Sequence, residues 1–223
     1  MNNNIRNHYE LIGGEYKDAK NTFNKKTDMN TLFRGIFLGP TNSGKNNLII
    51  EFLKRSPHIY NEIHIICRNR DQPFYNYLAD KLEDFIHFYG IGDIPTVDDF
   101  EDDGTLKLVI IDDFSNDTKL QKDIFSHYFI RGRHKKLSII MTTHAYHLGT
   151  NKVIRLNSDY VMILKANSKR DLKMILQDFN IPNVDEKQFY EMYKFCTASK
   201  GDFLMIDNVK SEIKHNFLEV LTK

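Results

Sequence analysis

The chain has 223 residues, a formal net charge of +1, two cysteines and no tryptophan. Hydrophobic residues make up 41% and charged residues 27%, which is typical of a soluble globular protein and excludes a collagen-like, disulfide-rich or mainly disordered chain. No apolar run approaches the roughly 18 residues of a membrane span, and the first ten residues lack the apolar core of a signal peptide. We therefore expect no membrane partner, no secretion, and reduced thiols at Cys67 and Cys196.

Residues 1–30 are polar, rich in Asn and Lys, and show no sustained hydrophobic period, which predicts a polar N-terminal arm. From Phe33 onwards, short apolar runs alternate with segments of helical spacing. The predicted strands are 33–40, 62–67, 85–90, 106–112, 137–144, 159–165 and 202–207. The predicted helices are 46–55, 74–82, 120–129, 169–179 and 186–195. This alternation predicts an α/β domain over 31–207, with a mostly parallel central sheet flanked by helices.

The last segment, 208–223, carries an apolar stripe. Val209, Ile213, Phe217 and Leu221 lie four residues apart, which predicts a C-terminal amphipathic helix or tail. Packing of the stripe against its own domain is the favoured interpretation, and docking on another protein is the alternative.

The first predicted strand is followed by a phosphate-binding pattern. Residues 39–46 read Gly-Pro-Thr-Asn-Ser-Gly-Lys-Asn, the G-x-x-x-x-G-K of a P-loop (Walker A) between a strand and a helix. Gly39 and Gly44 let the backbone curl around a phosphate, and Lys45 supplies positive charge to the β- and γ-phosphates. We therefore expect ATP as the bound cofactor. The residues expected to contact it are Gly39, Pro40, Thr41, Asn42, Ser43, Gly44, Lys45, Asn46 and Asn47.

Position 46 departs from this pattern. A hydroxyl normally follows the lysine and binds Mg²⁺, whereas here the residue is Asn46, whose amide oxygen is also a hard ligand. Three explanations stay open: a natural variant with adapted geometry, a change that cripples metal binding, and a subunit that binds nucleotide but hydrolyses it poorly.

The apolar strand 106–112 ends in two adjacent acids, Asp112 and Asp113, which is the Walker B arrangement. We expect Asp112 to hold Mg²⁺ together with Asn46, and Asp113 to orient the attacking water. Both acids follow the carboxyl end of a strand, where open α/β sheets bind their ligands. The structural alternative is a helix cap or a turn.

A positive charge for the γ-phosphate in the transition state is still needed. The candidates are Arg131 and Arg133 in the segment RGRHKK, and Arg155. Such an arginine is often supplied by a neighbouring subunit, which implies an oligomeric ring. A solvated helix end and contact with DNA phosphates are the alternatives for RGRHKK.

Strand 137–144 ends in Thr142, Thr143 and His144, next to the strand with the two acids if the strand order is the expected one. A polar residue there senses the γ-phosphate or aligns the water. We take His144 as the first candidate and Thr143 as the second, with a capping cluster as the structural alternative.

Four segments together resemble one family: GPTNSGK, LVIIDDF, FIRGRHKKLSIIMTTHAYH and KVIRLNSDYVMIL. They are similar to the genome-packaging ATPases of large DNA viruses and virophages, including the poxvirus packaging ATPase, in the FtsK/HerA branch of P-loop motors. The resemblance covers roughly residues 30–210. It implies a RecA/FtsK-HerA-like fold and a homo-oligomeric ring, a pentamer or hexamer, that moves double-stranded DNA into a preformed capsid using ATP and Mg²⁺. A capsid or portal vertex protein is a further implied partner, and the host cytoplasm (virus factory) and the virion are the implied locations.

Residue by residue, the resemblance makes Lys45 the P-loop lysine, Asp112 the magnesium-side acid and Asp113 the catalytic acid. His144 stands where relatives usually carry a glutamine, and Asn46 stands where they carry Ser or Thr. Two alternative functions remain: a nucleotide-binding assembly module with little hydrolysis, and a small-molecule or nucleotide kinase.

Overall fold

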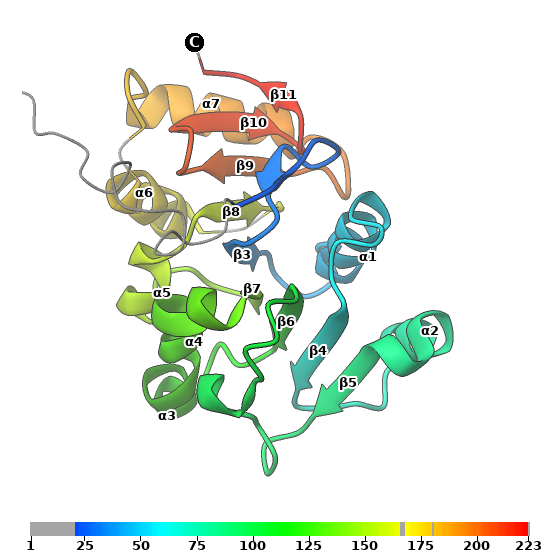
Figure 1. Cartoon of the computed structure of the whole chain (residues 1–223). Helices are drawn as coiled ribbons and strands as arrows, with labels where there is room; N and C mark the ends of the chain where they lie inside the picture. Colours follow the sequence, from blue (N-terminus) through cyan, green and yellow to red (C-terminus); the bar gives the residue numbers. More distant parts are fainter. Residues whose placement is uncertain (1–20, 166–167, 180, 223) are drawn as a thin grey trace, which may run out of the picture.

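The computed structural model of the protein describes residues 21–165, 168–179 and 181–222. The sheet strands are β3 (Arg34–Leu38), β4 (Glu62–Cys67), β5 (Ile86–Tyr89), β6 (Lys107–Asp112), β7 (Leu137–Thr143), β8 (Tyr160–Ile163), β9 (Leu204–Asp207), β10 (Glu212–His215) and β11 (Glu219–Val220). They form a nine-stranded sheet in the order β11-β10-β9-β8-β3-β7-β6-β4-β5 (Figure 1). All neighbours from β8 to β5 pair in parallel, and β9, β10 and β11 add an antiparallel flank. The predicted strands are confirmed.

Helices cover both faces of the sheet (Figure 1). They are α1 (Lys45–Arg55), α2 (Pro73–Leu82), α3 (Thr118–Leu120), α4 (Ser126–Arg131), α5 (Lys152–Leu156), α6 (Lys169–Asp178) and α7 (Glu186–Cys196). A π-helical turn, Gln121–Phe125, joins α3 to α4, so the helix predicted over 120–129 forms in three pieces. Among the described residues, no helix is both long and apolar enough to span a bilayer.

Two hydrophobic clusters lie on opposite faces of the sheet because successive strand residues point to opposite sides. Phe37 belongs to the cluster under α1 and α2, whereas its neighbours Ile36 and Leu38 belong to the cluster under α4 to α7. The strands are therefore buried on both faces, which is why they have continuous apolar sequences. Cys67 and Cys196 are free and buried.

Residues 21–30 differ from the polar arm expected there, whereas residues 1–20 lie outside the described residues. The segment forms a hairpin of β1 (Phe23–Asn24) and β2 (Met29–Asn30). Met29 and Thr27 are fully buried, so this hairpin is part of the domain. Each strand of the hairpin has only two residues, which is too short for an apolar pattern to be recognised in a polar sequence.

The predicted C-terminal helix over 208–223 is wrong, because the segment forms β10 and β11. Ser211 and Asn216 adopt left-handed backbone angles, φ 57° and 53°, which produce turns on either side of β10. The apolar residues that recur every fourth position therefore lie in strands and turns and not on one helix face. Ile213 and Phe217 are buried, whereas Val209 is exposed.

A buried ion-pair cluster joins the two ends of the described chain. Lys214 of β10 is fully buried, and its Nζ lies 2.6 Å from a carboxylate oxygen of Asp28 and 2.6 Å from one of Asp207. Removing one member of such a cluster leaves an uncompensated buried charge. The cluster therefore favours the strand conformation of β10, in which Lys214 points inwards.

Near the β4–β5 edge, His64 is buried and hydrogen-bonded on both ring nitrogens. Its Nε2 donates to Glu62 Oε2 at 3.0 Å, and the Tyr89 hydroxyl donates to Nδ1 at 3.1 Å. Burial lowers the pKa of His64 to about 4, and the hydrogen bond with Glu62 offsets only part of this effect.

We expect His64 to make stability fall in acid. The unfolded chain binds a proton at His64 below pH 6.5, whereas the folded chain binds it only near pH 4. The unfolded state thus carries more protons between these values, and stability drops as the pH falls from 6.5 to 4, by roughly 3 kcal/mol from this residue. Urea unfolding of His64→Gln between pH 4 and 7 should show a shallower loss than the unchanged chain. Substitution of the exposed His127 by Gln is the control, and an equally steep loss in His64→Gln would contradict the prediction.

Candidate functional site

Parallel pairing brings three strand ends to one edge of the sheet. Leu38 pairs with Thr143 between β3 and β7, and Ile111 pairs with Met141 between β6 and β7. The amide of Gly39 donates to the Thr143 carbonyl at 3.0 Å, which extends the pairing into the loop after β3. The P-loop, the two acids and the end of β7 therefore meet where the sequence predicted.

The loop 39–46 has the backbone of an anion-binding turn. Asn42 and Gly44 have positive φ, 63° and 107°, and α1 begins directly after Gly44 with no acidic residue in its first turn. A Cβ on Gly39 would collide with Ser43 Oγ, so a side chain does not fit there. Ser43 Oγ is itself buried and has no partner among the described residues. The free amides at the start of α1 suit a phosphate group.

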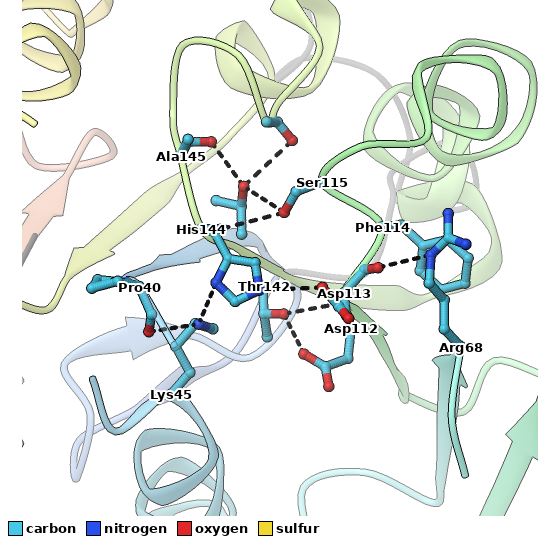
Figure 2. Close-up of polar contacts among 12 residues, drawn as sticks. Pro40, Lys45, Arg68, Asp112, Asp113, Phe114, Ser115, Thr142, His144 and Ala145 are labelled. Atoms are coloured by element: carbon cyan, nitrogen blue, oxygen red, sulfur yellow. Dashed lines mark hydrogen bonds and ion pairs between the residues drawn. The ribbon is translucent and has the colours of Figure 1, made fainter. Parts of the chain in front are cut away.

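The amine of Lys45 is held inside the loop (Figure 2). Its Nζ donates to the Gly39 carbonyl at 2.6 Å. It also donates to the Pro40 carbonyl at 3.1 Å and to His144 Nδ1 at 3.2 Å, as Figure 2 shows. Burial holds the pKa of Lys45 below its usual range, although Asp112 and Asp113 act in the opposite direction. A bound phosphate would add the negative charge that this buried cation lacks.

Asp112 ends β6 and is 8% exposed. The hydroxyl of Thr142 donates to one of its carboxylate oxygens, and the hydroxyl of Tyr75 on α2 donates to the other. Burial and the neighbouring Asp112 raise the pKa of Tyr75 far above its usual range, so its hydroxyl remains a donor. Two hydroxyl groups therefore orient the carboxylate and compensate for its burial.

Asp113 is exposed and has a left-handed backbone, φ 65°, which turns its side chain away from Asp112 (Figure 2). Its Oδ1 lies 3.2 Å from His144 Nε2. Because an ammonium group only donates, Nδ1 of His144 accepts from Lys45, and the ring proton on Nε2 is then donated to Asp113. His144 thus links the P-loop lysine to the second acid.

Thr143 does not join this group. Its hydroxyl donates to the carbonyl of Ala145 at 2.8 Å and lies 3.1 Å from Ser115 Oγ. The Ser115 hydroxyl also accepts from the His144 amide at 3.2 Å. These bonds shape the turn after β7, which is the capping role that the sequence left open.

A cavity of about 600 Å³ lies over these residues. Its lining consists of Thr41, Asn42, Gly44, Lys45, Asn46, Asn47, Gln72, Asp112, Asp113, His144 and Lys200. The sequence also assigned Gly39 and Pro40 to the site. They are not part of the lining, but their carbonyls accept hydrogen bonds from the Lys45 amine. Gln72 and Lys200 were missed, because each lies in a loop without a motif.

Asn46 and Asp112 both line the cavity, so the two residues expected to hold Mg²⁺ belong to the same site. An amide oxygen and a carboxylate are hard ligands of the kind that Mg²⁺ prefers. The donor set therefore fits a magnesium ion bound with a nucleotide.

The three arginines proposed for the γ-phosphate do not line this cavity. Arg131 and Arg133 precede β7 at the opposite edge of the sheet, where Arg131 lies 3.3 Å from Asp98. Arg155 is 8% exposed; its Nε donates to Asp178 at 3.0 Å and its Nη1 to the Thr150 carbonyl at 3.0 Å. Arg155 is thus held within its own chain, which argues against a role in a neighbour's site.

Solved structures with a similar fold are P-loop ATPases. The genome packaging NTPase B204 of Sulfolobus turreted icosahedral virus 2, in complex with AMP, is 19% identical, with a TM-score of 0.59 over 86% of this chain and 100% of that chain. The DNA-packaging ATPase B204 of Sulfolobus turreted icosahedral virus is 17% identical, with a TM-score of 0.57 over 82% and 96%. The cytoplasmic domain of the type VII secretion ATPase EccC of Thermomonospora curvata is 13% identical, with a TM-score of 0.56 over 84% and 25%.

No protein-family model and no curated protein matches the chain. At the identities of the solved structures, the likeness establishes the fold. The predicted fold class, a P-loop NTPase with a mostly parallel sheet flanked by helices, is therefore confirmed.

Removal of the Tyr75 hydroxyl should destabilise the protein, because the buried Asp112 carboxylate would lose one of its two donors. We expect Tyr75→Phe to lower the free energy of unfolding by about 1 to 3 kcal/mol, the usual cost of a lost bond to a charged group. Urea unfolding at pH 7 measures this. The exposed Tyr77 lies on the same helix, so Tyr77→Phe is the matched control; equal stability of the two variants would contradict the prediction.

Proposed function

We propose that the chain is an FtsK/HerA-type ATPase that uses ATP hydrolysis to move double-stranded DNA into a preformed capsid. The observation that carries this proposal is the convergence of Lys45, Asp112 and Asp113 in one open cavity at the carboxyl edge of the sheet. The fold it shares with B204, which is described as a genome packaging NTPase, supports the DNA-packaging role. Activity in the host cytoplasm, at the virus factory, and in the virion is part of the same proposal.

The residues divide the chemistry of phosphoryl transfer among them. The amides at the start of α1 and the Lys45 amine bind and orient the phosphates. Asp112 and Asn46 hold Mg²⁺, which when bound neutralises charge on the β- and γ-phosphates. Asp113 orients the water that attacks the γ-phosphorus and accepts its proton as the bond to the β–γ bridging oxygen breaks. The products are then ADP and inorganic phosphate.

His144 connects recognition of the terminal phosphate to Asp113. In the structure, it accepts from Lys45 and donates to Asp113. A γ-phosphate would compete for the Lys45 amine and release Nδ1 of His144, which can donate to a phosphate oxygen once this nitrogen carries a proton. We propose this residue as the sensor of the γ-phosphate, in place of the glutamine usual in the family that the sequence resembles.

We propose that a second subunit completes the site, and the position of the arginines supports this. Among the described residues, no arginine lines the cavity, and Arg131 and Arg133 lie at the opposite edge of the sheet. A ring, a pentamer or hexamer, would bring one of them to the cavity of the next subunit. Double-stranded DNA and a capsid or portal vertex protein are the further proposed partners.

One observation favours a second function, a nucleotide-binding assembly module with little hydrolysis. Asn46 takes the place of the hydroxyl residue that normally binds Mg²⁺. Its longer amide side chain places the oxygen ligand differently from a serine or threonine hydroxyl.

Asp113→Asn should abolish most ATP turnover but leave nucleotide binding intact, because the amide cannot accept the proton of water. We expect the rate of phosphate release with Mg²⁺ and double-stranded DNA to fall at least about a hundredfold. Asp80→Asn is the control, since Asp80 is exposed on α2 and lies outside the cavity lining. Unchanged turnover in Asp113→Asn would remove this residue from the mechanism, and turnover of the unchanged chain without any response to DNA would contradict the motor.

Substitutions of Asn46 separate the two functions. If the amide oxygen is a working ligand, the unchanged chain and Asn46→Thr should both hydrolyse ATP, and Asn46→Ala should need about tenfold more Mg²⁺ for half-maximal rate. A Mg²⁺ titration of phosphate release measures this. Turnover in Asn46→Thr alone would instead favour the assembly module.

A further inference from the structure

The turn between α7 and β9, residues 197–202, reaches the P-loop from the antiparallel flank. Because β9 runs antiparallel to β8, its first residue Leu204 pairs with Ile163, the last residue of β8. The start of β9 therefore lies at the carboxyl edge of the parallel strands, beside the P-loop. A parallel β9 would have carried this turn to the other edge.

This turn packs directly on Gly44, the glycine that precedes α1. A Cβ built on Gly44 would lie 3.8 Å from the Cα of Gly201. The turn is fixed by its own bonds, because the Asp202 amide donates to the Ser199 carbonyl at 3.3 Å and Asn216 Nδ2 donates to Asp202 Oδ1 at 3.2 Å. Lys200 is thus carried on an anchored turn at the rim of the cavity.

The charged residues of the cavity lining differ in their partners. Lys45 and Lys200 are the basic residues in the lining, and Asp112 and Asp113 are the acidic ones. Lys45 is engaged by the loop carbonyls and His144, whereas exposed Lys200 has no hydrogen bond or ion pair within the described ranges 21–165, 168–179 and 181–222. Lys45 and a magnesium ion held by Asn46 and Asp112 would both act on the β- and γ-phosphates, which leaves Lys200 as the cation of the lining for the remaining phosphate.

The strand order indicates which end of the nucleotide lies near Lys200. The P-loop follows β3, the acids follow β6 on one side of β3, and the turn precedes β9 on the other side. The terminal phosphate reacts beside Asp113, so the rest of the nucleotide extends towards the turn. Asn47 and Gly201 also line a neighbouring hollow beside α1, which places the turn next to the helix start rather than next to the acids.

We propose that Lys200 binds the α-phosphate of the nucleotide and that the turn 197–202 forms the wall of the site on the nucleoside side. The inference rests on the proposed function, since it assigns a binding residue to the same cavity. An α-phosphate is common to nucleoside mono-, di- and triphosphates, so Lys200 contributes equally to the binding of all three. It therefore retains the nucleotide before and after hydrolysis without distinguishing the two states.

Equilibrium binding of AMP, ADP and ATPγS to the full chain tests this assignment. Lys200→Met should weaken all three affinities by about the same factor, on the order of tenfold for the loss of one charge-assisted bond. Lys200→Arg should restore most of the affinity. Lys187→Met, on the exposed surface of α7 outside the cavity, is the matched control and should bind like the unchanged chain. Unchanged melting temperatures would show that the variants are folded.

Three results would overturn the proposal: affinities of Lys200→Met equal to those of the unchanged chain, a loss confined to ATPγS, or no binding of any of these nucleotides by the unchanged chain. A loss confined to ATPγS would place the lysine at the γ-phosphate. Binding does not require turnover, so the outcome is separable from the proposed function. An unchanged chain that binds nucleotide but neither hydrolyses ATP nor responds to DNA would end the motor proposal, while the binding comparison would still decide the role of Lys200.

Discussion

The parallel pairing of β3, β7 and β6 is the constraint on which the site depends. It sets Leu38 beside Thr143 and Ile111 beside Met141, so three segments distant in the sequence end at one edge. The side chains that follow these strands therefore lie close together at that edge. Thr142 reaches the Asp112 carboxylate only because its strand runs in the same direction as β6 and next to it.

The site balances buried charge with a small number of bonds. Asp112 is held by two hydroxyl groups, whereas Lys45 has only backbone carbonyls and an imidazole as partners. Burial consequently holds the pKa of Lys45 below its usual range even with two acids nearby. A folded protein keeps a cation under such conditions where a ligand compensates for it, and the loop amides beside Lys45 point to a phosphate as that ligand.

The antiparallel flank, β9 to β11, extends the sheet and also carries the turn beside the P-loop. Lys214, buried between Asp28 and Asp207, joins β10 to the N-terminal hairpin and to β9. The turn 197–202, at the other end of β9, is held by Asn216, whose Nδ2 donates to Asp202 Oδ1 at 3.2 Å. The residue that follows β10 therefore anchors the turn that carries Lys200.

The sequence by itself determined the P-loop, the two acids and most of the strands and helices, because these depend on residues that are close together in the chain: a glycine-lysine pattern, an apolar run, a helical spacing. Only the tertiary structure decided which cations face the cavity. Arg155 proved to be an internal partner of Asp178, and Lys200 lines the cavity although it belongs to no motif. It also decided that β10 and β11 form within 208–222, where Lys214 of β10 pairs with Asp28, 186 residues away. Contacts over such separations leave no periodic pattern in the sequence, and they arise only when the sheet is assembled.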